Sequence, residues 1–105
     1  MATFAKLREI VEEPLAASAI DDASSLFDRF DDAWEGLKWL LARKADSLGE
    51  ASRGGNANLR LYVQAGDAIA DAPEIWLLFE IENNQIVVHS IKFLKAANEQ
   101  DEDPA

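Results

Sequence analysis

The second half of the chain alternates between apolar and polar residues with a period of two, which is the pattern of half-buried β-strands. The first such segment covers residues 59–65, where aliphatic residues occupy every odd position. We expect this aliphatic set to face the core and the intervening residues to form a polar face. The residues of that polar face are Arg60, Tyr62 and Gln64.

Two more strands are predicted over residues 74–82 and 85–93, separated by the turn Asn83-Asn84, because asparagine tolerates a positive φ. The earlier of these strands carries apolar residues on both faces, which is typical of a central strand. Sequential pairing then gives an antiparallel meander with residues 74–82 in the middle. We expect a sheet of three strands, or of four if a further strand precedes the helices.

The first half has helical spacing. Over residues 22–46 the apolar positions fall within a stripe about 140° wide, as in an amphipathic helix. Trp39 lies off this stripe, so it is either covered by a second element or exposed as an interface residue. The stripe consists of Leu26, Phe27, Phe30, Ala33, Trp34, Leu37, Leu40 and Leu41.

The N-terminal segment permits two interpretations. Apolar residues from Phe4 to Leu15 recur at helical spacing, which predicts a helix over residues 3–13 and a short turn or helix to residue 19. Pro14 interrupts that pattern, and a strand over residues 6–11 is the alternative. In either case we expect one α+β domain over residues 1–97 and a disordered acidic tail over residues 98–105.

Composition narrows the classes of partner. The net charge is −10, so the surface repels nucleic-acid phosphates and anionic membranes, and a basic protein partner is favoured. The chain has no cysteine, which excludes disulfides and thiolate chemistry and fits a cytoplasmic protein. No apolar run approaches the roughly 18 residues that cross a bilayer.

Few residues suggest chemistry. His89, the one histidine, lies within a predicted strand and is a candidate general base or a partly buried structural residue. If Arg60 and Lys92 lie on the same side of the sheet, they form a small cationic patch with Tyr62 and Gln64 that is suited to a phosphate or a base. An ordinary solvated sheet face is the alternative. No motif predicts a metal or a cofactor.

Three segments together resemble the RelE/ParE superfamily of bacterial type II toxins. They are FDDAWEGLKWLL at residues 30–41, LRLY at 59–62 and IWLLFEIENNQIVVHSIK at 75–92. The resemblance implies a helical pair followed by an antiparallel sheet, and many members place a strand before the helices. It also implies an antitoxin that wraps around the toxin, and action on ribosome-bound mRNA or on DNA gyrase.

For the RNA-cleaving members, the resemblance implies basic residues on the sheet, here Arg60 and Lys92, and a tyrosine or histidine near the end of the last strand. Phe93 stands at that aromatic position, and the chain is acidic where these toxins are basic. Both departures count against nuclease activity. The leading hypothesis is a RelE/ParE-like toxin-family protein that acts on translation or on a protein target, or a degenerate member without nuclease activity. The competing hypothesis is a non-enzymatic interaction module that uses Trp39 and a sheet edge to form a homodimer or to dock on a basic partner.

Overall fold

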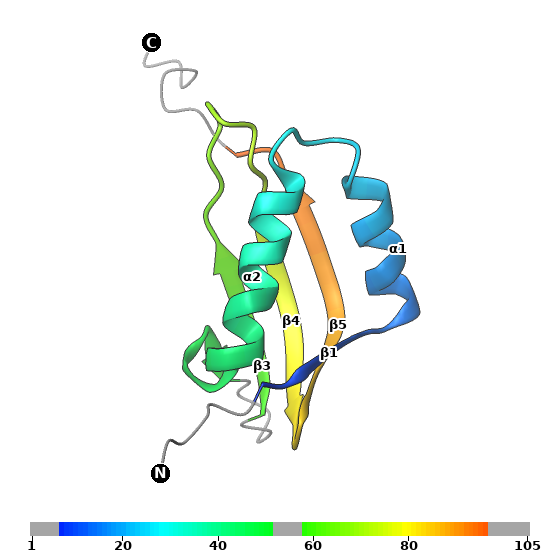
Figure 1. Cartoon of the computed structure of the whole chain (residues 1–105), viewed down its shortest axis with the longest axis vertical. Coiled ribbons are helices and arrows are strands. Elements are labelled where there is room, and N and C mark those ends of the chain that lie inside the picture. Colours follow the sequence, from blue (N-terminus) through cyan, green and yellow to red (C-terminus); the bar gives the residue numbers. More distant parts are fainter. Residues whose placement is uncertain (1–6, 52–57, 97–105) are drawn as a thin grey trace.

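The computed structural model describes residues 7–51 and 58–96. Over these residues, two α-helices lie on one face of a five-stranded mixed sheet, which confirms the predicted α+β class (Figure 1). The predicted loop at residues 52–56 and the predicted tail at 98–105 lie outside the described residues. The elements are β1 (Glu9–Glu12), α1 (Pro14–Ala23), α2 (Phe30–Lys44), the 3₁₀ turn η1 (Ala45–Ser47), β2 (Glu50–Ala51), β3 (Leu59–Gln64), β4 (Glu74–Glu82) and β5 (Gln85–Leu94).

The strand order is β1-β5-β4-β3-β2. The predicted meander is confirmed, with β4 between β3 and β5 and antiparallel to both. The expectation of three or four antiparallel strands is wrong in two respects. A short strand, β2, extends the sheet beyond β3, and β1 pairs with β5 in parallel. β2 has no signal of its own because it is only two residues long, and the sequence does not show that the strand before the helices pairs in parallel.

The N-terminal segment corrects the preferred prediction. Among the described residues, no helix precedes Pro14; β1 runs instead over Glu9–Glu12, which agrees with the alternative of a strand. Pro14 is the first residue of α1, where its missing N–H costs nothing and its fixed φ suits the helix. Ile10 pairs with Ile86 of β5 and packs against the core, so long-range pairing overrides the helical spacing.

The predicted helix over residues 22–46 is two elements rather than one. α1 ends at Ala23, where the Ser24 hydroxyl donates to the Asp21 carbonyl at 2.7 Å, and α2 begins at Phe30. The connection is attached to a distant loop, because the Asp28 amide donates to the Asp71 carboxylate at 2.9 Å. Leu26, which was assigned to the apolar stripe, lies in this connection and is exposed.

The core lies between α2 and the sheet. One side of β4 is fully buried there, together with alternate residues of β5 and the inner face of α2. α1 lies over β5 and contributes Ala16, Ile20 and Ala23 to the same core (Figure 1). The principal members are Phe30, Trp34, Leu37, Leu41, Ile75, Leu77, Phe79, Ile86, Val88 and Ile91.

A β-bulge interrupts β5. Leu78 pairs with Ser90 but the next residue, Phe79, pairs with Val88, so His89 is the extra residue on the bulged strand. The bulge changes the alternation of β5, because Val88 and Ile91 are both buried although they are three residues apart. Strict alternation predicts that His89 lies on the side of Val87, Ile91 and Phe93. The bulge leaves it on the side of Val87 and Glu80 but opposite Ile91 and Phe93, so that prediction is wrong for the last two residues.

Two glycines provide a matched test of this fold. Gly49 has a φ of +68°, and a Cβ there would lie 2.2 Å from the Leu61 carbonyl oxygen, whereas a Cβ on Gly36 of α2 would meet nothing within 4 Å. We expect Gly49→Ala to lower the free energy of unfolding by about 2 kcal/mol or more. Gly36→Ala should raise it by about 0.5–1 kcal/mol. Urea denaturation measures both; equal effects would contradict the close approach of Gly49 to β3.

Candidate functional site

The face of the sheet opposite the helices carries a contiguous group of exposed apolar side chains. On β4 the alternate residues Trp76 and Leu78 point to this side, and the paired residues of β3 join them. The exposed fractions are 47% for Leu61, 43% for Val63 and 41% for Trp76. We call the surface formed by Leu61, Val63, Trp76, Leu78, Ser90 and Lys92 the open sheet face.

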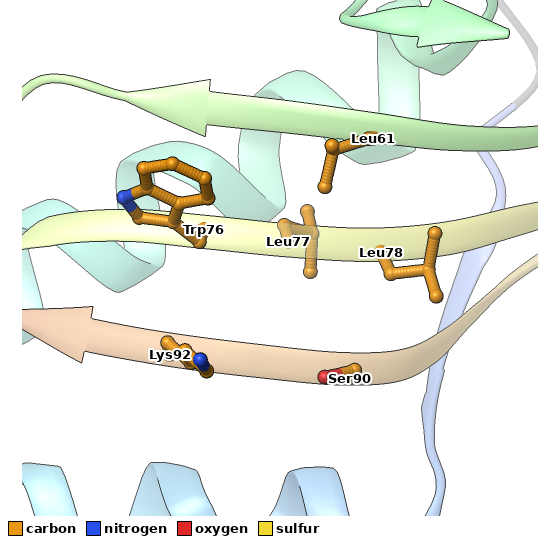
Figure 2. Close-up of a pocket in the computed structure, with 6 residues that line it drawn as sticks. All are labelled: Leu61, Trp76, Leu77, Leu78, Ser90 and Lys92. Atoms are coloured by element: carbon orange, nitrogen blue, oxygen red, sulfur yellow. The ribbon is translucent and has the colours of Figure 1, made fainter. Parts of the chain in front are cut away.

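A shallow hollow of about 330 Å³ lies on the open sheet face. Its lining comes from three adjacent strands, and Figure 2 shows the Trp76 indole beside it, with Leu61 directed from β3 towards β4. Ser90 has a short side chain directly opposite Leu78, and this leaves space between the larger neighbours. The hollow therefore accepts a bulky apolar group and has little means to hold a polar one.

Carboxylates surround this apolar area. Glu50 pairs with Leu61, and on β4 the same side that bears the indole also bears Glu74, Glu80 and Glu82. The Glu74 carboxylate accepts a hydrogen bond from the Trp76 indole nitrogen at 2.6 Å, which orients the ring. Among the strand residues that the structure describes, Lys92 is the one lysine or arginine on this side. The surface is thus apolar at its centre and negative at its rim.

β3 presents the opposite faces from those predicted. Arg60, Tyr62 and Gln64 pair with the buried residues of β4 and therefore lie on the helix side, while the aliphatic set of β3 lies on the open sheet face. Tyr62 packs against the core, and the Gln64 amide donates to the Ala33 carbonyl of α2 at 3.5 Å. Arginine, tyrosine and glutamine have long apolar parts and can therefore occupy the helix-facing side of a strand. Alternation alone does not identify which of the two sides of β3 is buried.

Arg60 is consequently a structural residue. Its Nε donates to the Leu48 carbonyl at 2.7 Å and its Nη2 donates to the Gly49 carbonyl at 2.9 Å. These bonds satisfy carbonyls in the turn between η1 and β2. Lys92 is exposed on the other side of the sheet. The predicted cationic patch does not form, because the sheet separates its two bases.

His89 bridges two carboxylates. Its Nε2 lies 2.9 Å from a Glu80 oxygen, and its Nδ1 makes a short contact with Glu13, the residue between β1 and α1. Both ring nitrogens are therefore occupied, so neither is available to take a proton from a substrate. His89 therefore has a structural role: through Glu13 and Glu80 it joins the β1–α1 connection to β4 at the centre of the sheet.

The two carboxylates also set the protonation of this histidine. Burial lowers the pKa of His89, but the hydrogen bonds that the ring donates to Glu80 and Glu13, together with the charges of both carboxylates, outweigh burial and raise the pKa above 6.5. The raised pKa favours the imidazolium, which donates from both nitrogens and satisfies both carboxylates.

Two other predicted residues fall away from the open sheet face. Phe93 lies on the helix side, 5.0 Å from the Phe30 ring and 6.2 Å from the Trp34 ring, so its ring packs against the core. Trp39 is 52% exposed on α2, and the Arg43 guanidinium stacks 4.2 Å from its ring. No described element covers Trp39, and it lies on the opposite side of the molecule from the open sheet face.

Neither a metal site, nor a membrane-spanning helix, nor a known relative identifies a ligand for the residues that the structure describes. Within residues 7–51 and 58–96, no cluster of three or more histidine, aspartate or glutamate side chains is arranged to hold a metal ion. None of the helices in this part of the chain has the length and apolarity needed to cross a membrane. Comparison with protein-family models, curated proteins and solved structures gives no match.

The residues of the open sheet face were missed by sequence reasoning, although a signal for them was present. Trp76 and Leu78 are apolar on the side of β4 opposite Ile75 and Leu77. That pattern predicts a central strand, which is correct, but it also implies burial on both sides. Among the described residues, helices cover only one side, so the second apolar side is left as a surface.

The His89 bridge leads to a pH prediction. Since the folded pKa is raised, its contribution to stability is complete below the unfolded pKa, about 6.5, and is lost as the pH rises through the folded pKa. We expect His89→Gln to cost about 1–2 kcal/mol of unfolding free energy at about pH 6, and less at about pH 9. Urea denaturation across this pH range measures the difference.

The matched control is Lys92→Gln, which removes a positive charge from an exposed position of the same strand. The effect of Lys92→Gln on the unfolding free energy should not differ comparably between these two pH values. A His89→Gln deficit that stays constant or grows with pH would contradict a protonated bridge.

Proposed function

We propose that this protein is a non-enzymatic interaction module that binds a basic partner protein on the open sheet face. The observation that carries this proposal is the contiguous group of exposed apolar side chains on Leu61, Val63 and Trp76, framed by carboxylates. Exposed apolar areas with a polar rim are characteristic of protein-binding surfaces.

Charge complementarity defines the partner. The rim carries Glu50, Glu74 and Glu82, and the chain as a whole has a net charge of −10. A partner that places lysine or arginine around exposed apolar side chains would bury the apolar centre and neutralise the rim. The long-range field would also speed its association, and this rate should fall as salt increases.

The arrangement of the predicted catalytic residues supports binding over catalysis. Arg60 is engaged with two backbone carbonyls, both nitrogens of His89 are occupied by carboxylates, and Lys92 is the one lysine or arginine among the described strand residues on its side of the sheet. Phosphodiester cleavage needs positioned charge and a proton-transfer group at one site. These three residues do not come together at one site.

Site-specific crosslinking tests the proposal. A photo-reactive residue in place of Val63 should capture a basic protein in the organism of origin, while one in place of Glu35 on α2 should not. With the captured protein purified, we expect Leu61→Gln to weaken binding at least tenfold, or about 1.4 kcal/mol. Calorimetry measures the dissociation constants.

Leu26→Gln is the matched control, because Leu26 is exposed in the α1–α2 connection and away from the sheet. It should leave binding within twofold of the unchanged protein. Capture from Glu35 alone, or binding that is indifferent to Leu61→Gln, would contradict the proposed surface.

A second candidate is a RelE/ParE-like toxin-family protein that acts on a protein target, with an antitoxin-like protein as the basic partner. The specific observation in its favour is the order of elements: a strand, two helices and then three consecutive antiparallel strands. This order fits the arrangement that the family resemblance implies, including the strand before the helices. This support rests on the order of elements alone, so it is weaker than the support that the exposed surface gives to binding.

Induced expression in bacteria separates the two candidates. A toxin of this kind should arrest growth without ribosome-dependent cuts in mRNA, and Lys92→Ala should leave the arrest unchanged. Phe93 in the core provides no proton for cleavage, which is why we expect intact mRNA. Normal growth would remove this candidate, and mRNA cleavage lost in Lys92→Ala would restore the nuclease hypothesis.

A further inference from the structure

The open sheet face offers side chains but no backbone partners. β4 pairs with β3 through residues 75–80 and with β5 along its whole length, so its amides and carbonyls are used within the sheet. A strand laid across this face would leave its own backbone groups without partners, which is costly where water is excluded. A helix satisfies its backbone internally and carries no such cost.

From this constraint, and resting on the proposed function, we infer that the occupant of the open sheet face is an amphipathic helix of the basic partner. α2 shows that a helix can pack on these strands, because it covers their other side (Figure 1). A partner helix would complete a helix–sheet–helix sandwich, in which both apolar sides of β4 are covered.

The sequence of side chains along β4 defines the pattern that this helix needs. On the open side the order is Glu74, Trp76, Leu78 and Glu80, and the exposed Glu82 follows Glu80, whose carboxylate is already bonded to His89. The apolar pair thus lies between carboxylates. The six residue steps from Glu74 to Glu80 extend about 20 Å, a length that about 13 residues of helix also span. The partner helix therefore carries lysine or arginine near both ends and apolar residues at spacings of three and four between them.

The hollow provides the anchor point. It is lined by Trp76, Leu61 and Ser90, which Figure 2 shows on three adjacent strands. One bulky apolar residue of the helix would enter it, and truncation of such an anchor removes a large share of the binding energy. Lys92 at its border excludes a partner lysine from this position and favours an apolar or acidic neighbour.

Two other occupants fit less well. A second copy of this chain would bring its own carboxylate rim against Glu50, Glu74 and Glu82, and Lys92 is the one lysine or arginine that the described strands of each copy place on this side. The chain's own residues 98–105 contain four acids and no base, so they add to the repulsion. Like charges placed across an interface cost binding energy.

Two synthetic peptides test the inference on the full-length protein. Both have about 16 residues and the same composition, with lysines near both ends; one places its leucines at helical spacing and the other at alternate positions. We expect the helical peptide to bind at least tenfold more tightly by calorimetry. Its helicity, followed by circular dichroism, should rise when the protein is added.

The variants show where the peptide binds. Leu61→Gln should weaken it at least tenfold, and Glu50→Gln with Glu74→Gln should weaken it about tenfold. The control pair Asp31→Asn with Glu35→Gln removes the same charge from the exposed side of α2 and should leave binding within twofold. Thermal melting confirms that each variant is folded.

Each of the other possible results contradicts one specific claim: the helical occupant, the binding surface or the basic partner. If the alternating peptide binds as tightly, and Leu61→Gln still weakens both, the occupant is not a helix but the binding surface stands. If neither peptide is affected by Leu61→Gln, the proposed function fails as well. If sedimentation shows a dimer that Leu61→Gln dissociates, the occupant is a second copy.

Discussion

The burial of one side of β4 beneath α2 is the interaction on which the rest of the structure depends. Ile75, Leu77 and Phe79 are fully buried against the helix, and their neighbours in sequence are forced to the other side by the geometry of a strand. Once this side is fixed, the register with β3 and β5 fixes every other assignment. The apolar surface on the far side is therefore a direct consequence of how the core forms.

The bulge at His89 is the one place where this regular alternation is broken. Without the extra residue, Val88 and Ile91 would not both reach the core, and the histidine would not meet Glu80 and Glu13 on the other side. The bulge thus serves two purposes at once: it keeps β5 apolar beneath both helices, and it joins β1 and α1 to the central strand through a charged bridge. The single parallel pair of the sheet lies beside this bridge, between β1 and β5.

The same register explains why the candidate site is a binding surface. Pairing places Arg60 under α2 and Lys92 on the outside, so no arrangement of their side chains brings them together. The group that the register does bring together is Leu61, Trp76, Leu78 and Ser90, which is poor in reactive groups and rich in apolar area. Such a surface acts by what it covers and excludes from water, and its acidic rim determines which partners approach it.

The amino-acid sequence by itself determined the α+β class, the three consecutive antiparallel strands and the helical content near Trp34, because these depend on local periodicity and turn chemistry. It also determined that β4 is central, since both of its sides are apolar. Only the tertiary structure decided which side of β3 is buried, because Leu61 and Tyr62 are both acceptable core residues and the choice depends on pairing with β4. Tertiary structure likewise decided that the segment after Arg8 forms a strand and that His89 is a bridge, because the partners of both are distant in sequence and the energy of pairing them outweighs local preference.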